Sequence, residues 1–339
     1  MRICDALQPQ VAISEFTTSV YLTFIRIRVF MLCKCEQVPR RREQVMRGIS
    51  GVFLIVALLA GWGIGSPASA AENSARKQSE AEAFKLNIAG RQRMLTQRIS
   101  KAACLTHMGV DAVLHESMAR DASMQFRMTL TALRIGNPGR GLEPEQSRAV
   151  LIQLDKTEAL WEAFEPFASR AAGKTPDLAA LKEVHARNVI LLKQMNRTVS
   201  AIQAEMDDGQ EASQLSMALN IAGRQRMLSQ KAVKDLCFLS SGNDTENDRK
   251  ALTETAAEFE NTLHELRAGN AARNLIAAPS WEIDAQLEMV ENLWFEMAPI
   301  IQTAIAGGDV SKADLGYAAF IAEAVLNEMN TAVSMYEKL

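Results

Sequence analysis

The sequence predicts an all-α protein built from two tandem up-down-up-down four-helix bundles. Three observations lead to this prediction. The segment LNIAGRQRMLTQ at residues 86–97 recurs as LNIAGRQRMLSQ at residues 219–230, 133 positions later. Apolar residues recur at spacings of three and four, which is the period of a helix buried on one face. Only 18 glycines and 9 prolines occur in 339 residues, which leaves long stretches without a helix breaker.

The repeat extends well beyond these twelve residues. With the same offset, matching residues recur along most of the two copies, as in the pairs Phe126 and Phe259, Leu133 and Leu266, Gly136 and Gly269, and Trp161 and Trp294. A repeat of about 130 residues indicates two copies of one structural unit. We therefore predict one bundle over residues 74–207 and a second over residues 210–339.

Four helices are expected in each copy, separated by glycine- and proline-containing breaks such as GNPGRG and GKTPD. In the first copy the predicted helices span residues 74–108, 111–135, 143–172 and 176–206. In the second copy they span residues 211–239, 245–268, 280–306 and 309–338. Helices of this length with short connections are typical of an antiparallel bundle.

The N-terminal region has the features of an export signal. Residues 46–70 combine a basic start, an apolar run and the small-x-small ending Ala68-Ser69-Ala70. We expect a cleaved signal peptide and a periplasmic protein, with an uncleaved N-terminal membrane anchor as the alternative. Residues 1–45 fit neither a signal nor a domain, and Met46 stands where a signal peptide would begin, so these residues are interpreted as a dubious extension.

The charge of the expected mature chain limits its partners. Residues 1–71 hold 8 of the 37 basic and 4 of the 40 acidic residues, so the remainder has a net charge near -7. A protein this acidic is a poor partner for nucleic acid or anionic lipid. Any bound anion has to be held by a local group of arginines.

The repeated helix has two organised faces on a helical wheel. One face carries Phe84, Ile88, Leu95, Ile99 and Ala102 and is expected to pack inside its own bundle. The opposite face carries Leu86, Ala89, Arg93, Gln97, Ser100, Cys104 and His107. In the second copy this face carries Leu219, Ala222, Arg226, Gln230, Val233 and Cys237. Small, apolar and sulfur-bearing side chains on one face predict a helix–helix contact there.

Glycine in mid-helix costs about 1 kcal/mol relative to alanine. We expect Gly90 and Gly223 to accept that cost so that another helix can approach closely. If the partner is the equivalent helix across a two-fold axis, Arg93 would face an identical arginine. A small planar oxyanion between two guanidinium groups would relieve their repulsion and accept paired hydrogen bonds.

The motif N-x-A-G-x-x-R-M resembles the signature of the PilJ-type domain found at the N-terminus of type IV pilus chemotaxis transducers. It is also similar to the P-box of the nitrate/nitrite sensor kinases NarX and NarQ. That resemblance implies a nitrate or nitrite site at a two-fold helix interface, with Arg93 and Arg226 as donors. The other ligand-contacting candidates on the same helices are Gly90, Gly223, Gln97 and Gln230.

The tandem arrangement allows one chain to imitate a sensor dimer. If the chain reverses at Asp208-Gly209, the first helices of the two copies lie side by side and Arg93 meets Arg226. A Cys104–Cys237 disulfide is then expected, since export favours oxidation. If the helix continues through Gly209, the bundles stack end to end and a site forms only between two chains of a homodimer.

Two functions fit these features. The first is a periplasmic oxyanion sensor that acts through a membrane-bound sensor or transporter, because the sequence has no HAMP-like, kinase or methyl-accepting segment. The second is an envelope adaptor whose outward helix face binds another helical protein without a ligand. No enzyme activity, cofactor or metal is expected, because the four histidines are scattered and no Glu-x-x-His or C-x-x-C-H pattern occurs. Arg91 and Arg224 are predicted to point toward the bundle core and to pair with carboxylates.

Overall fold

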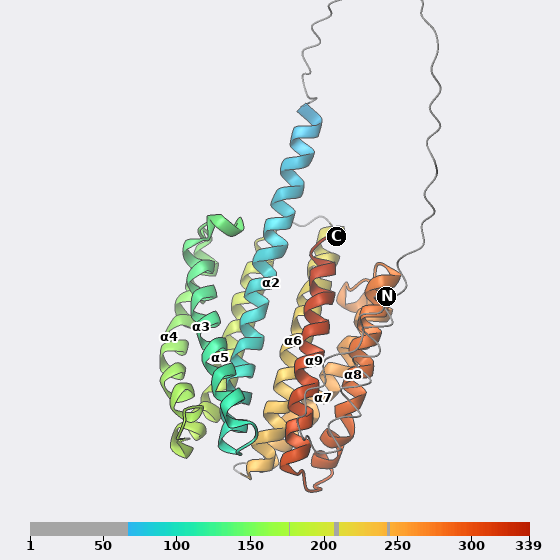
Figure 1. Cartoon of the computed structure of the whole chain (residues 1–339). Helices are drawn as coiled ribbons and strands as arrows, with labels where there is room; N and C mark the ends of the chain where they lie inside the picture. Colours follow the sequence, from blue (N-terminus) through green and yellow to red (C-terminus); the bar gives the residue numbers. More distant parts are fainter. Residues whose placement is uncertain (1–66, 176, 207–209, 243–244) are drawn as a thin grey trace, which may run out of the picture. The chain divides into compact units, whose positions relative to one another are not determined.

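The computed structural model describes residues 67–339, except 176, 207–209 and 243–244, and this part of the chain is all α apart from short turns (Figure 1). The first copy consists of α2 (Pro67–His107), α3 (Ala112–Ile135), α4 (Arg148–Ala171) and α5 (Leu178–Ala204). The second consists of α6 (Gln210–Ser241), α7 (Thr245–Ala268), α8 (Trp281–Ile305) and α9 (Lys312–Tyr336). The predicted all-α class, with four long helices in each copy, is confirmed.

Side-chain caps fix the starts of four of these helices. Ser147, Asp177 and Ser280 each accept a hydrogen bond from a backbone N–H in the first turn, and Ser311 forms a reciprocal capping box with Asp314. The cap at Ser147 places the start of α4 five residues later than predicted.

The residues before α4 form a turn that occurs in both copies. Short 3₁₀ helices, η1 (Pro138–Arg140) and η2 (Ala271–Arg273), lie inside the predicted breaks. Gly136 precedes η1 with φ of 79°, and a Cβ there would lie 2.7 Å from the carbonyl oxygen of Leu142. Only glycine fits this position without strain. The matching Gly269 has φ of 82°.

Each bundle core contains the same aromatic stack. Phe126 of α3 packs on Trp161 of α4 with ring centroids 4.2 Å apart, and Phe259 packs on Trp294 at 3.9 Å. All four rings are buried. Stacked aromatic pairs stabilise a core beyond their buried area, so the repeat preserves a packing unit as well as a sequence.

The two copies pack against each other through α2 and α6. Buried polar pairs connect the two copies near the C-terminal ends of α2 and α6. Lys101, which is completely buried, pairs with Glu323 of α9 at 2.6 Å, and its counterpart Lys234 donates to the side-chain oxygen of Asn188 in α5 at 2.8 Å. These contacts join residues more than 40 positions apart, so the helical periodicity could not predict them.

A buried histidine lies beside the Lys101–Glu323 pair. His115 is 3% exposed, and its Nδ1 atom has no hydrogen-bond partner. Burial, reinforced by the positive charge of Lys101, lowers the pKa of His115 to about 4. The folded protein therefore keeps this imidazole neutral at pH values where the unfolded chain binds a proton.

We predict that His115 makes the protein acid-sensitive between about pH 6.5 and pH 4. Because the unfolded state binds more protons there, the free energy of unfolding decreases as the pH is lowered from 6.5 to 4, by at most roughly 3 kcal/mol from this group. Urea unfolding at pH 7, 5.5 and 4.5 measures the effect. The His115→Gln variant should show a shallower pH dependence, whereas identical slopes in the two proteins would contradict the prediction.

Most of the N-terminal region lies outside the described residues. This includes residues 1–45 and residues 46–66 of the expected signal peptide, while residues 67–70 form the first turn of α2. Among the helices that the structure does describe, none is long and apolar enough to cross a membrane. The signal peptide and the periplasmic location stay predictions.

Candidate functional site

The first helices of the two copies lie side by side and run in the same direction, with matching residues opposite each other. A disulfide joins Cys104 to Cys237, with their Cα atoms 6.2 Å apart. The side-by-side arrangement and the disulfide pairing agree with the corresponding predictions, whereas the end-to-end alternative does not. The reversal itself, at residues 207–209, lies outside the described residues. We call the α2–α6 interface over residues 86–104 and 219–237 the arginine seam.

Arg93 and Arg226 meet within this seam. The Cβ position of Gly90 lies 3.2 Å from Nη2 of Arg93 and 3.9 Å from Nη2 of Arg226. At Gly223 the corresponding distances are 3.3 Å from Arg226 and 3.6 Å from Arg93. The two guanidinium groups are therefore neighbours, and both arginines are buried, with exposed fractions of 4% and 3%.

The structure makes the role expected for Gly90 and Gly223 more specific. We predicted that they allow another helix to approach closely; beyond their own helix backbone, the atoms within 4 Å of their Cβ positions are the Nη2 atoms of the two arginines, one from each helix. The glycines make room for the guanidinium groups. An alanine at either position would press on a guanidinium group and shift it by a few tenths of an ångström.

The asparagines of the repeated motif accept hydrogen bonds from the arginine of the opposite copy. Arg226 donates from Nη2 to the side-chain oxygen of Asn87 at 2.7 Å. Arg93 donates from Nη2 to the backbone carbonyl of Asn220 at 3.2 Å. Arg226 also donates from Nη1 to the side-chain oxygen of Asn330 at 3.3 Å, but its Nε atom has no partner. We did not predict a role for the asparagines, although their presence in both copies of the motif was a usable signal.

Gln97 and Gln230 lie one turn beyond the arginines and are completely buried. Gln97 donates from Nε2 to the hydroxyl of Thr96, and Gln230 donates from Nε2 to the carbonyl of Ala322 in α9. Both side-chain oxygens lack a hydrogen-bond partner. The structure thus places both predicted glutamines inside the seam, with part of their hydrogen-bonding capacity unused.

The seam concentrates positive charge in a buried place. Burial, with the neighbouring charges of Arg224 and Arg226, lowers the pKa of Arg93 to about 9. Burial and the charge of Arg91 lower the pKa of Arg226 to about 10, against the opposing influence of Glu337. No ion pair to Arg93 or Arg226 is formed within the described ranges. Buried charges are ordinarily paired. Arg93 lacks this compensation among the described residues, and Arg226 has only the nearby charge of Glu337, with which it forms no ion pair.

Arg91 and Arg224 lie outside the seam and only partly follow the prediction. Arg224 pairs with Glu258 of α7, as expected. Arg91 is exposed and donates instead to the side-chain oxygen of Gln125 in α3. Neither residue is buried in the bundle core, since Arg91 is exposed and the side chain of Arg224 is 34% exposed.

The described side chains do not form a metal site. No group of three or more histidine, cysteine, aspartate or glutamate residues among them could hold an ion. The buried donors of the seam are guanidinium and amide N–H groups, which suit an anion.

Comparisons with known proteins identify the same two units. A sequence profile described as "Type IV pili methyl-accepting chemotaxis transducer N-term" matches residues 75–186 and again residues 210–317. The methyl-accepting chemotaxis protein McpN of Pseudomonas aeruginosa is 36% identical over 118 residues, which cover 34% of this chain and 21% of McpN. The similarity thus spans about a fifth of the length of that relative.

Proposed function

Because this chain belongs to the PilJ family of type IV pili methyl-accepting chemotaxis transducer N-terminal domains, we propose that it is a sensory protein that binds a small oxyanion between its two copies. The observation that carries this proposal is the pair of buried, adjacent guanidinium groups of Arg93 and Arg226, which form no ion pair with a carboxylate among the described residues. Two unit charges roughly 7 Å apart repel by about 2 kcal/mol at an effective dielectric of ~20. A bound anion would remove this repulsion.

Nitrate and nitrite are the proposed ligands. A guanidinium group presents N–H donors in a planar fork, which matches the spacing of two oxygens on a planar oxyanion. Such an anion can accept hydrogen bonds from both arginines at once. Its single negative charge would lie between the two guanidinium groups and offset their repulsion. Chloride provides the charge without the planar arrangement of acceptors, so it is the natural comparison ligand.

The output of the proposed sensor is a change in the packing of α2 against α6. The disulfide holds the two helices together 11 residues beyond each arginine, about 16 Å along the helix axis. The disulfide fixes the distance between the helices on that side. A ligand that draws the arginines together would therefore move the residues of α2 and α6 that precede the seam. A membrane-bound sensor or transporter would detect this change from the periplasmic side of the membrane. The protein itself would catalyse no reaction.

The adaptor alternative receives less support from the structure. It required the helix face that carries Ala89, Arg93 and Gln97 to bind a separate helical protein. All three residues are buried in the chain itself, against the second copy. A partner could reach this face only if the two copies separated.

Isothermal titration calorimetry of the exported protein with nitrate, nitrite and chloride tests the proposal. We expect nitrate or nitrite to bind at one site per chain, and binding to be lost in the Arg93→Ala/Arg226→Ala variant. Arg120→Ala/Arg148→Ala is the matched control, because it removes the same charge from two exposed positions outside the seam. Equal binding heats in the wild type and the seam variant would refute the proposed site.

A further inference from the structure

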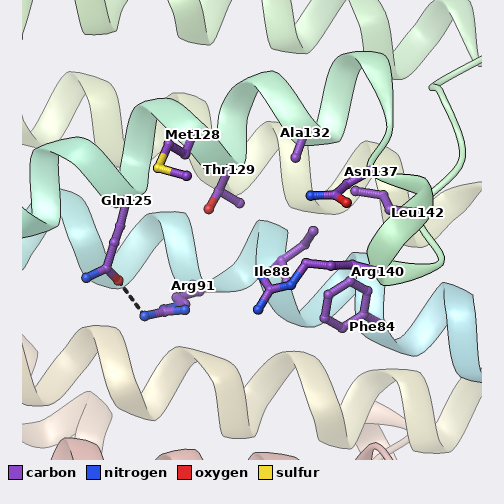
Figure 2. Close-up of a pocket in the computed structure, with 10 residues that line it drawn as sticks. All are labelled: Phe84, Ile88, Arg91, Gln125, Met128, Thr129, Ala132, Asn137, Arg140 and Leu142. Atoms are coloured by element: carbon purple, nitrogen blue, oxygen red, sulfur yellow. Dashed lines mark hydrogen bonds between the residues drawn. The ribbon is translucent and has the colours of Figure 1, made fainter.

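The first copy contains a pocket that is separate from the arginine seam. It lies between α2, α3 and the turn around η1 and has a volume of about 160 Å³. Its lining, drawn in Figure 2, consists of Phe84, Ile88, Arg91, Gln125, Met128, Thr129, Ala132, Asn137, Arg140 and Leu142. The pocket thus combines an apolar wall with two arginines.

The two arginines approach the pocket from different elements. Arg91 extends from α2 toward Gln125, and Arg140 comes from η1 and lines the same pocket as Ile88 and Phe84 (Figure 2). Partial burial lowers the pKa of Arg91, and the charges of Arg98 and Arg140 lower it further. Among the residues that the structure describes, no carboxylate forms an ion pair with Arg91 or Arg140.

The second copy shows what these two arginines lack. Their counterparts are Arg224, which pairs with Glu258, and Arg273, which pairs with Glu265. The first copy has Gln125 in place of Glu258 and Ala132 in place of Glu265. Two carboxylates of the protein therefore neutralise the arginines in one copy, whereas the same place in the other copy is open.

The apolar wall limits the kind of anion that fits. Phe84, Ile88 and Leu142 present hydrocarbon beside the guanidinium groups, and Met128 extends the wall on the α3 side. An apolar cavity of about 150 Å³ holds one benzene molecule. The pocket accordingly has room for a carboxylate with a body about as large as one aromatic ring, and a small inorganic anion would leave the apolar wall uncovered.

We propose that this pocket binds a small organic carboxylate with an apolar body, whose charged group takes the place that Glu258 and Glu265 occupy in the second copy. Arg91 and Arg140 hold the carboxylate, Gln125 orients Arg91, and Phe84, Ile88 and Leu142 contact the body. The site is independent of the oxyanion proposed for the seam. The two copies then differ in function, one open to a ligand and the other closed by its own side chains.

Calorimetric titration of the whole exported protein with benzoate tests the proposal, with butyrate as a smaller carboxylate and neutral benzamide as the uncharged counterpart. We expect benzoate to bind at one site per chain and benzamide at least tenfold more weakly. The Gln125→Glu/Ala132→Glu variant gives the first copy the carboxylates of the second and should lower benzoate affinity at least tenfold. The fold already accepts glutamates at these positions in the second copy.

Two controls separate the pocket from other sources of binding. Ala112→Glu/Gln146→Glu adds the same charge at exposed positions outside the pocket and should bind benzoate like the wild type. Arg93→Ala/Arg226→Ala should also retain benzoate binding, even if it loses nitrate. The proposal is overturned if no carboxylate binds to the wild type, or if the Gln125→Glu/Ala132→Glu variant binds benzoate as tightly as the wild type. Loss of benzoate binding in the seam variant alone would overturn it as well.

Discussion

Replacing Cys104 and Cys237 with alanine is expected to lower the free energy of unfolding by about 5 kcal/mol. The disulfide joins residues 133 positions apart. In the chain-entropy treatment, a cross-link that closes a loop of this length greatly restricts the unfolded chain, and its removal stabilises the unfolded state. Alanine is the better replacement, because both sulfurs are completely buried and a serine hydroxyl there would need a partner.

Urea unfolding followed by circular dichroism measures this difference. Reduction of the wild type should give nearly the same loss as the double variant, since both open the same loop. Mass spectrometry of the purified protein under non-reducing conditions provides the direct check, because the bonded form lacks two hydrogens. Two free thiols in that protein, or an unchanged free energy of unfolding in the variant, would contradict the prediction.

Replacing Arg93 and Arg226 with methionine is expected to stabilise the protein by a few kcal/mol in the absence of nitrate. Methionine has a similar length without the charge. Replacing a buried ion pair with apolar side chains of similar volume is often neutral or stabilising by about 1–4 kcal/mol, and two neighbouring buried like charges should gain at least as much. The wild type should gain stability when nitrate is added, by about 2.7 kcal/mol at a concentration of ~100 times the dissociation constant. The variant should gain nothing, since it cannot hold the anion.

Thermal and urea unfolding with and without nitrate measures both parts of this prediction. Arg224→Met is the matched control, because this arginine is half-buried and already paired with Glu258. Its loss should change the free energy of unfolding by only about 0–1 kcal/mol and leave the response to nitrate intact. If Arg93→Met/Arg226→Met is less stable than the wild type without nitrate, the seam arginines support the fold and their repulsion is not significant.

The helices were predictable because their signals are local. Apolar spacing and glycine-containing breaks placed α3 and α7 at almost the observed residues. The start of α4 was predicted wrongly, because the turn around η1 depends on contacts between Gly136, Leu142 and the segment before Ser147. Such contacts form only when the chain closes on itself, and they leave little trace in helical periodicity.

The candidate site was predictable only in part. The repeat singled out Arg93 and Arg226, and the wheel placed them opposite the core-facing stripe. Their partners were missed, since Asn87 and Asn220 act across the copies and not within their own helix. The difference between Arg91 and Arg224 also depends on residues of the next helix, Gln125 in one copy and Glu258 in the other.

The sequence by itself determined the all-α class, the two copies, and the helix face that carries the arginines and the cysteines, because periodicity and repetition are properties of the chain. The tertiary structure decided that the two equivalent faces meet within one molecule. It also showed that the glycines make room for guanidinium groups and that the arginine pocket is open in only one copy. These features depend on distances between residues far apart in the sequence, and packing determines such distances.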